Sequence, residues 1–271
     1  MSASSHPMQE NRAVLEKRDG GVATLILNRP ERMNALNKDL VLALNDALTR
    51  VEADEEINVV VLAGAGRAFC AGGDLAAIGK GRQENNTAEL QPILRSGMQA
   101  VLKIRTMRQP VIAAVHGAAA GAGMNIALAA DIRIASEDAM FGQNFAKMGL
   151  FPDYGGTFFL PQLVGPAKAA ELFYTGDMIN AAEALRLGVV NRVVPLAQLE
   201  NEVRALAQKI ALGPAIAIRA VKQTLFGRDR EELTALLDLE VEQQMKCFLS
   251  GDCDEGIRAF FEKRAPKFQG K

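Results

Sequence analysis

The sequence feature that most constrains the fold is a pair of short apolar segments, each followed by a loop of small residues and then by a helical pattern. The first segment is 58–63 (NVVVLA) and the second is 110–115 (PVIAAV). Such runs are typical of strands that are buried on both faces, as in parallel sheets covered by helices. The loops that follow, 64–75 and 116–123, are rich in glycine and alanine. This alternation of strand, loop and helix predicts an α/β fold.

The N-terminal part of the chain adds a tail, a hairpin and a helix to this pattern. Residues 1–11 are mostly polar and are expected to form a disordered tail. Two apolar runs, 13–18 and 22–27, flank an Asp-Gly-Gly turn and predict a β-hairpin. The apolar residues of 38–52 recur at helical spacing, whereas 79–87 are polar and contain glycine, which favours a mobile surface loop.

After residue 166 the pattern becomes mainly helical, with one expected strand at 189–194. We therefore predict a sheet-bearing core of residues 12–195 and a helical C-terminal region of residues 196–271. The helices expected beyond residue 166 are 166–175, 181–187, 196–211, 214–226, 229–249 and 252–263.

Composition excludes several classes of protein. The 271 residues are 49% apolar and carry a formal net charge of −1, so the chain can bury a core and has no basic field for nucleic acid. No apolar run reaches the roughly 18 residues of a membrane span, and the polar start shows no secretory signal, so we expect a cytoplasmic protein that binds no membrane. The 3 cysteines form no disulfide framework, and the 2 histidines leave little for a metal site or a Ser-His triad.

The two loops rich in glycine and alanine are the first candidates for a functional site. Loops without bulky side chains let backbone N–H groups approach a ligand, and a following helix adds partial positive charge at its N-terminus. Two such loops can direct two N–H donors at one developing oxyanion. The pattern is equally consistent with two tight strand-to-helix turns that are small for steric reasons, and spacing alone leaves both interpretations open.

Other chemical motifs in the sequence are weak. The second loop carries part of a dinucleotide fingerprint, but Ile126 stands where a third glycine is required, and no P-loop motif is found. His116 is best interpreted as a hydrogen-bonded structural histidine, and Cys70 as a small packing residue. Asp153 follows Phe-Pro in a turn sequence, and composition alone favours turn or cap stabilisation over the role of a carboxylate base.

Several separated motifs, in order, resemble the crotonase (enoyl-CoA hydratase/isomerase) superfamily over about residues 12–271. The two loops carry much of the resemblance, with RAFCAGGDL at 67–75 and PVIAAVHGAAAGAG at 110–123. The other matching segments are NRPERMNALN at 28–37, FGQ at 141–143, TGD at 175–177, GVV at 188–190 and EGIRAFFEKR at 255–264. The resemblance implies a ββα spiral core, a helical C-terminal trimerisation region and acyl-CoA thioesters as substrates.

The resemblance also implies roles for individual residues. The thioester oxygen would be held by the backbone amides of Gly73 and Ala122, which stabilise an enolate. No cofactor is implied, because CoA is part of the substrate. The positions implied to contact the CoA or the acyl group are Arg32, Ala35, Ala71, Gly72, Asp74, Leu75, Gly121, Asn125, Phe145 and Phe151, together with Phe260 and Lys263, which typically reach the CoA of a neighbouring subunit.

Two departures from the family pattern bear on the reaction. Hydratases of this family use two glutamates, and the corresponding positions here are Asn125 and Phe145, neither of which transfers a proton at neutral pH. Asp153 stands where another branch keeps its acid/base residue. The segment around it, KMGLFPDYGGT at 147–157, is most similar to the phenylacetate-pathway isomerases, which act on 2-(1,2-epoxy-1,2-dihydrophenyl)acetyl-CoA and also shift Δ3 double bonds to Δ2.

The sequence therefore favours an acyl-CoA isomerase in which one carboxylate, Asp153, serves as acid and base. An atypical enoyl-CoA hydratase and a catalytically silent acyl-CoA-binding protein are the alternatives. The 4-chlorobenzoyl-CoA dehalogenase branch also uses an aspartate near this position, but it has a tryptophan where Phe145 stands, which makes that interpretation weaker.

The helical C-terminal region predicts a homotrimer or a dimer of trimers. The resemblance implies trimerisation through this region, and apolar faces on terminal helices usually need a partner surface. We expect such a face at the apolar stripe formed by Leu233, Leu236, Leu237 and Val241.

Overall fold

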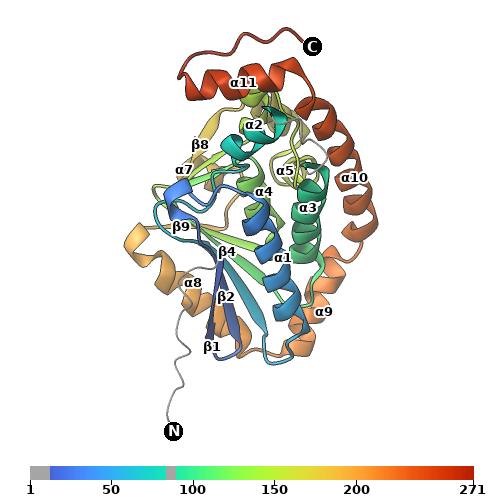
Figure 1. Ribbon diagram of the computed structural model, residues 1–271. Coiled ribbons are helices and arrows are strands. Elements are labelled where there is room, and N and C mark those ends of the chain that lie inside the picture. Colours follow the sequence, from blue (N-terminus) through green and yellow to red (C-terminus); the bar gives the residue numbers. More distant parts are fainter. Residues whose placement is uncertain (1–12, 84–89) are drawn as a thin grey trace.

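The centre of the fold is a six-stranded sheet, which is parallel except for the hairpin at one edge (Figure 1). The computed structural model describes residues 13–83 and 90–271, so the expected tail at 1–11 and the end of the expected loop, 84–87, lie outside the described residues. The strands, in spatial order, are β1 (Val14–Asp19), β2 (Val22–Leu27), β3 (Val59–Gly64), β4 (Val111–Val115), β6 (Ile132–Ser136) and β9 (Arg192–Val194).

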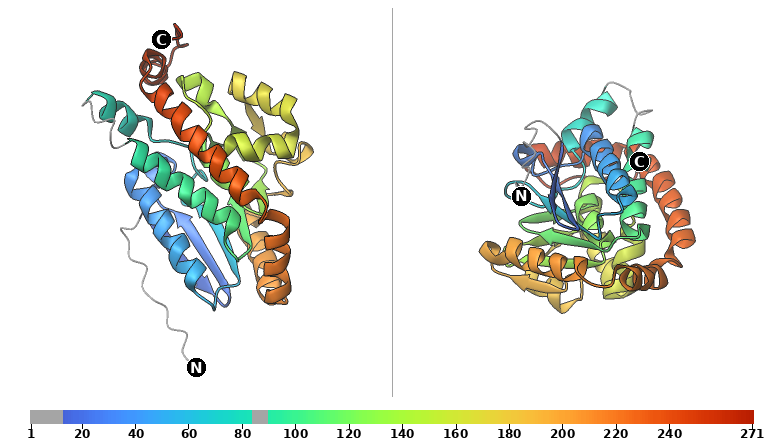
Figure 2. Two further views of the ribbon diagram at one scale, coloured as in Figure 1. Left: turned by 90° about the vertical axis from the view of Figure 1, so that its right-hand side faces the viewer. Right: turned by 90° about the horizontal axis from the view of Figure 1, so that it is seen from below.

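Helices cover both faces of this sheet (Figure 2). Side chains alternate along each strand, so that Val60 and Leu62 of β3 face α1 (Lys38–Ala53) and α3 (Leu90–Thr106), whereas Val59 and Val61 face α8 (Leu196–Ala211). Because both faces are buried, the strands read as continuous apolar runs. The division expected at residue 195 therefore separates α8 from the sheet that it covers.

A second sheet, α2 (Leu75–Gln83) and α11 (Gly251–Phe261) lie at one end of the large sheet, and α9 (Ala215–Phe226) lies at the other end (Figure 1). The second sheet contains β5 (Ala118–Ala120), β7 (Met140–Gly142) and β8 (Met178–Asn180). Its strands are too short to show alternation, and β8 is a strand that the helical pattern after residue 166 did not predict. The other helices are η1 (Pro30–Arg32), α4 (Ala122–Ala129), η3 (Asn144–Met148), α5 (Gly156–Val164), α6 (Pro166–Thr175), α7 (Ala181–Arg186) and α10 (Asp229–Phe248).

Two expectations about local structure are wrong. Residues 79–83 belong to α2 and are not part of a surface loop. The apolar stripe of α10 does not face a partner: Leu233, Leu237 and Val241 are buried against the core of their own chain, and Leu236 packs against it. Amphipathic spacing identifies a face that must be covered, but it does not identify what covers it.

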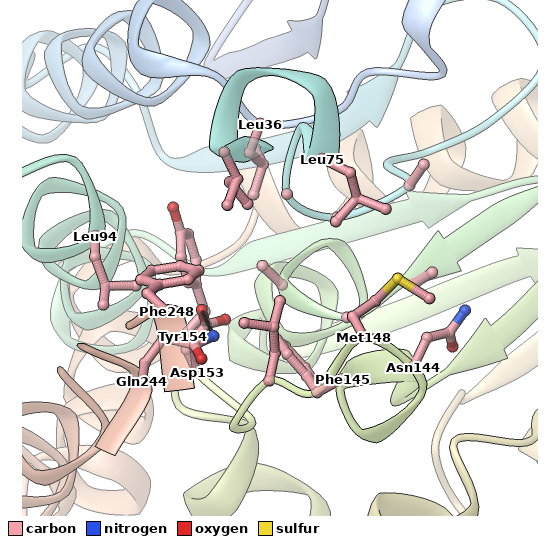
Figure 3. A pocket seen from close by; sticks show the side chains of 18 of the residues that line it. Leu36, Leu75, Leu94, Asn144, Phe145, Met148, Asp153, Tyr154, Gln244 and Phe248 are labelled. Atoms are coloured by element: carbon pink, nitrogen blue, oxygen red, sulfur yellow. Dashed lines mark hydrogen bonds between the residues drawn. The ribbon is translucent and has the colours of Figure 1, made fainter. Parts of the chain in front are cut away.

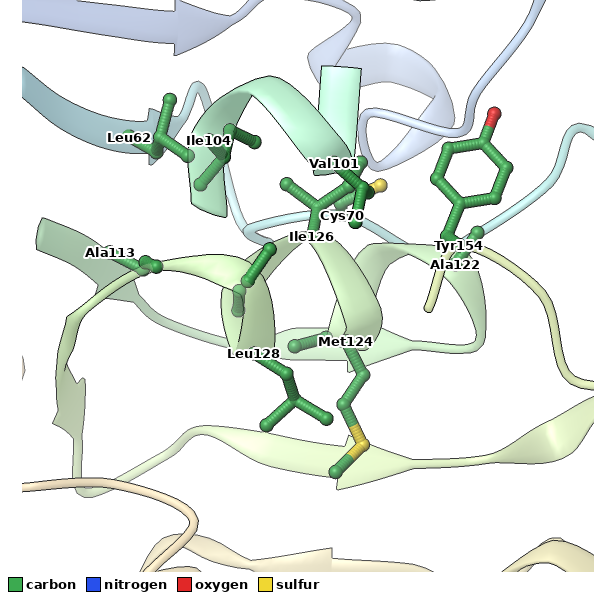
Figure 4. Packing of buried hydrophobic residues seen from close by; sticks show 14 of the residues in the cluster. Leu62, Cys70, Val101, Ile104, Ala113, Ala122, Met124, Ile126, Leu128 and Tyr154 are labelled. Atoms are coloured by element: carbon green, nitrogen blue, oxygen red, sulfur yellow. The ribbon is translucent and has the colours of Figure 1, made fainter. Parts of the chain in front are cut away.

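Helix α4 lies near the centre of the molecule (Figure 1), and Figure 4 shows the packing of buried side chains around it. All eight of its residues are buried, as expected for a helix that is apolar or small at every position except Asn125. Ile126 packs with Val101 and Ile104 of α3, and Cys70 lies beside them. This packing fixes the N-terminus of α4, which is where the second glycine- and alanine-rich loop ends. Among the described residues, no helix has the length and hydropathy needed to cross a bilayer.

Candidate active site

The first loop follows β3 and is held on both sides by backbone hydrogen bonds. On one side, the Leu36 amide donates to the Gly72 carbonyl (2.7 Å) and the Asp74 amide donates to the Leu36 carbonyl (3.0 Å). Both partners of Leu36 flank Gly73, so the Gly73 amide points away from Leu36, as in a parallel ladder. On the other side, the Cys70 amide donates to the carbonyl of Ala118 (3.0 Å).

The second loop presents the amide of Ala122, the first residue of α4. First-turn amides have no acceptor within their own helix, so this N–H group is available to a ligand and lies at the positive end of the helix dipole. Close approach of the two loops requires glycine: a Cβ at Gly72 would lie 2.7 Å from the Ala120 carbonyl oxygen, and one at Gly123 would lie 2.3 Å from the Cys70 carbonyl oxygen.

Gly73 and Ala122 both line a cavity of about 180 Å³. Figure 3 shows Asp153 beside Gln244 on one side of this cavity and Leu36 on the other. The rest of the wall is mainly apolar. It consists of Leu75, Ile78, Leu90, Ile93, Leu94, Met148, Leu150, Phe145, Phe248 and Phe260, the small residues Ala71, Gly72, Ala120 and Gly121, and the polar residues Asn144 and Tyr154. The cavity therefore suits an apolar group with one polar end directed at the two amides.

Asp153 is 5% exposed, and burial raises the pKa of its carboxyl to about 8. Its Oδ2 accepts a hydrogen bond from Gln244 Nε2 at 2.9 Å, which by itself lowers the pKa, and the nearby Glu240 carboxyl raises it. Its Oδ1 has no hydrogen-bond partner among the described residues. One oxygen is therefore fixed and the other is free to exchange a proton.

The cavity brings together nine of the residues singled out from the sequence. Asp153, Gly73 and Ala122 line it, as do Ala71, Gly72, Leu75, Gly121, Phe145 and Phe260. Phe260 is 54% exposed and lines the cavity of its own chain, whereas the resemblance implied contact with a neighbouring subunit's CoA.

Six of the residues implied to bind substrate do not line the cavity. Asn125 is fully buried, and its Nδ2 donates to the Asp153 carbonyl oxygen at 2.6 Å. Asp74 accepts from Arg29 (3.0 Å) and from the amide of Ala77, which lies in the first turn of α2. The other four are Ala35, Phe151, Arg32 and Lys263. The Ala35 carbonyl accepts a hydrogen bond from Arg29, and the Phe151 amide donates one to Gln244. The side chains of Arg32 and Lys263 are exposed.

Sequence reasoning missed Gln244, Glu240 and Tyr154. The first two lie one turn apart on α10, about 90 positions after Asp153, and no local motif marks them. Tyr154 has a φ of 56°, which is rare for a residue with a side chain. A Cβ at Gly97 of α3 would lie 1.9 Å from the Tyr154 hydroxyl, so a glycine inside that helix makes room for the phenol. His116, as expected, has a structural bond, with Nε2 2.9 Å from the Gly66 carbonyl oxygen.

Comparison with known proteins identifies the family of this chain. The family described as enoyl-CoA hydratase/isomerase matches residues 17–271. A probable enoyl-CoA hydratase of Rhodobacter capsulatus is 43% identical over 93% of this chain and 95% of its own length. The 1,2-epoxyphenylacetyl-CoA isomerase of Escherichia coli is 38% identical over 95% of this chain and 98% of its own length. The crystal structure of an enoyl-CoA hydratase from Mycobacterium avium subsp. paratuberculosis superposes with a TM-score of 0.86 at 32% identity, covering 95% of this chain and 98% of that one.

These matches confirm two predictions made from the sequence. The α/β fold with a crotonase-type core is confirmed by the structural match, and the resemblance to the superfamily is confirmed over nearly the whole chain. The relatives include both hydratases and an isomerase, so similarity alone does not separate the two reactions.

Proposed function

Because the chain belongs to the enoyl-CoA hydratase/isomerase family, we propose that it is an acyl-CoA isomerase that moves a double bond with a single carboxyl group. The substrate is a CoA thioester with a 3-enoyl chain or, by analogy with the Escherichia coli relative, an epoxyphenylacetyl group. The amides of Gly73 and Ala122 bind the thioester oxygen, and Asp153 transfers the proton.

The observation that carries this proposal is the set of ionisable groups on the cavity wall. Among the described residues that line it, Asp153 supplies the sole carboxyl group. At the two positions where hydratases hold glutamates, Phe145 lines the cavity and Asn125 lies behind the wall. Neither position therefore supplies the carboxyl groups with which hydratases add water. A single carboxyl group suffices to move a proton between two carbons.

The proposed reaction has two proton transfers. Asp153 removes a proton from carbon 2 of the 3-enoyl thioester, and the electrons move into the thioester carbonyl to give a dienolate. The two amides donate hydrogen bonds to its oxygen, and the N-terminus of α4 adds partial positive charge. Asp153 then returns the proton to carbon 4, which gives the 2-enoyl product with no change in atoms. A pKa of about 8 suits a group that takes and releases a proton near neutral pH.

The CoA part of the substrate is proposed to lie along an open depression that meets the cavity at Leu75. This depression, of about 850 Å³, lies between α2 and α11 and is lined by the cations Lys80, Arg82 and Arg258. The carboxylates Asp254 and Glu262 also line it, and Asp254 forms an ion pair with Arg82. Cationic side chains of this kind suit the phosphates of CoA. The proposed proton transfers need no cofactor beyond the CoA that the substrate carries.

An atypical enoyl-CoA hydratase is the second candidate, since the Rhodobacter capsulatus relative carries that name. A catalytically silent acyl-CoA-binding protein is the third. Purified protein should be given 3-enoyl-CoA and 2-enoyl-CoA separately. The isomerase forms 2-enoyl-CoA from the first substrate, the hydratase forms 3-hydroxyacyl-CoA from the second, and the silent protein does neither.

The decisive variant is Asp153→Asn, which keeps the shape of the side chain and cannot transfer the proton. We expect kcat for the double-bond shift to fall by about 10²–10⁴ while CoA-ester binding, measured by calorimetry, is retained. Asp138→Asn, at an exposed aspartate outside this cavity, is the matched control. Wild-type turnover by Asp153→Asn would mean that Asp153 is a turn residue and that the one-carboxyl mechanism is wrong.

A further inference from the structure

Helix α10 holds the chain on both sides of Asp153. Before Asp153, the Gln244 side-chain amide bonds to both backbone groups of Phe151: Oε1 accepts from the N–H at 2.9 Å, and Nε2 donates to the carbonyl at 2.9 Å. After it, Glu240 Oε2 accepts from the Gly155 amide at 2.7 Å, and its Oε1 accepts from the Thr157 amide at 3.1 Å. The segment that carries Asp153 is therefore positioned by one turn of α10.

Gln244 and Glu240 also act on the Asp153 carboxyl, in opposite directions. Gln244 Nε2 donates to Oδ2 and so favours the ionised form, while the negative charge of Glu240 disfavours it. Both residues are 1% exposed, so water screens neither effect well.

The other titratable groups near Asp153 bring no charge. Tyr154 follows it in the chain, and Cys70 lies close to Tyr154; burial raises the pKa of the phenol well above its usual value and that of the thiol to about 12. Both are therefore neutral at pH 7. From α4, the group that faces this segment is the amide of Asn125, and the cavity side chains of α3 are apolar. Among the described residues, Glu240 is thus the group whose charge acts on Asp153; burial raises the pKa of its own carboxyl to about 7, so this charge develops as the pH rises through about 7.

We propose that Gln244 and Glu240 are positioning residues for the proton transfer: Gln244 fixes one oxygen of Asp153 by a hydrogen bond, and Glu240 keeps the other available to a proton by its charge. This inference rests on the proposed role of Asp153. Helix α10 then contributes to the reaction itself, because Gln244 and Glu240 set both the orientation and the basicity of the Asp153 carboxyl group.

The test is the pH dependence of kcat/KM for 3-enoyl-CoA isomerisation in two variants. Gln244→Leu removes the donor to Asp153, so we expect kcat to fall by about 10–100-fold with KM nearly unchanged, and the rise of kcat/KM with pH to move to higher pH. Glu240→Gln removes the negative charge that Glu240 carries above about pH 7, so the same rise moves to lower pH, by at most about one unit. A purely structural role would not shift the two profiles in opposite directions.

Matched controls come from the same helix. Gln243→Leu changes the neighbouring glutamine, which does not line the cavity, and Glu242→Gln removes an exposed carboxyl paired with Lys246. Both are expected to keep the wild-type profile. Should Gln244→Leu or Glu240→Gln fail to fold, Gln244→Glu is the substitute: it keeps the acceptor for the Phe151 amide, adds a charge beside Asp153 and moves the rise to higher pH.

Two results would overturn the inference. Folded variants that keep the wild-type pH profile, or that shift it in the same direction, would show that α10 only holds the loop. Asp153→Asn, assayed in parallel, separates this failure from that of the proposed function. If Asp153→Asn is inactive and the α10 variants leave the profile unchanged, only the inference is wrong; if Asp153→Asn is fully active, both are wrong.

Discussion

At the scale of single residues, Asp153 is unusual because its carboxyl group is buried, although carboxyl groups favour contact with water. One of its oxygens has no partner among the described residues, and a second buried carboxyl, Glu240, lies nearby. An uncompensated buried charge destabilises a fold, so the group is held mainly protonated at neutral pH. A site that retains such a residue gains a proton carrier whose pKa is close to the pH at which it operates.

This arrangement predicts a pH-dependent stability that disappears in Asp153→Asn. The pKa of Asp153 is raised to about 8 in the folded chain from its ordinary value of 3.8, so the folded state holds a proton that the unfolded chain releases above about pH 4. Its contribution to stability therefore falls as pH rises, by at most about 1.4 kcal/mol per pH unit, until the pH passes about 8.

Thermal unfolding of wild type and Asp153→Asn should be compared at several pH values between about 5 and 8. The Tm of the variant relative to wild type should increase as pH rises, because asparagine has no proton to release. Parallel Tm curves for the two proteins across this range would mean that the pKa of Asp153 is not raised by folding.

At the scale of elements, Asn125 connects α4 to the segment that carries Asp153. Its Nδ2 donates to the Asp153 carbonyl oxygen (2.6 Å), and its Oδ1 accepts from Gln143 Nε2 (2.7 Å). Asn125→Ala leaves both partners buried without a bond, so we expect a loss of about 1–3 kcal/mol in the free energy of unfolding. Because Asn125 does not line the cavity, kcat should fall much less than in Asp153→Asn.

Urea unfolding and steady-state kinetics of Asn125→Ala check both parts of this prediction, with Asn201→Ala as a control at an exposed position. A kcat as low as that of Asp153→Asn would give Asn125 a direct role in the reaction. Unchanged stability would mean that its hydrogen bonds contribute nothing net to the fold.

A buried ion pair attaches α9 to the rest of the molecule. Lys222 Nζ donates to Asp131 Oδ2 (2.8 Å) and to the carbonyl oxygens of Ile104 (3.0 Å) and Gln109 (2.9 Å). Burial lowers the pKa of Lys222 and raises that of Asp131, and each charge partly restores the other. Lys222→Met leaves Asp131 buried without its cation, so we expect a loss of about 3–5 kcal/mol in stability.

Lys246→Met is the matched control for this prediction, because Lys246 forms an exposed pair with Glu242 and should cost less than about 1 kcal/mol. Urea unfolding of the two variants gives the comparison. Equal losses would mean that burial of the Lys222 pair has no energetic consequence.

The elements and the loops of the site could be predicted from sequence because their signals are local. Buried strands such as β3 and β4 read as apolar runs, and Gly72 and Gly123 mark loops that must approach each other closely. Contacts made only in the tertiary structure leave no such signal. The bond of Gln244 to Asp153 joins positions 91 residues apart, and the three-residue strand β8 is too short for a periodic pattern.

At the scale of the whole molecule, the exposed apolar surface that indicates an oligomer lies on α9 and not on α10. The stripe of α10 is covered by its own chain, but α9 is nearly uncovered, with Lys222 as its buried residue. Large apolar side chains are exposed along and just before α9, namely Leu212, Ile216, Val221 and Leu225, at 89%, 86%, 57% and 62% of their surface. Exposed apolar residues gathered in this way are typical of a surface that another chain covers.

We therefore predict a homotrimer or a dimer of trimers in which α9 is covered by a neighbouring chain. Sedimentation at micromolar concentration should give a mass of three or six times 29.1 kDa. The double variant Ile216→Lys/Leu225→Lys places two charges on this surface, so its mass should fall towards that of one chain, whereas Leu42→Lys, at an exposed leucine of α1, should leave the assembly intact. A wild-type mass of one chain would contradict the prediction, and an intact assembly of the double variant would mean that the chains meet elsewhere.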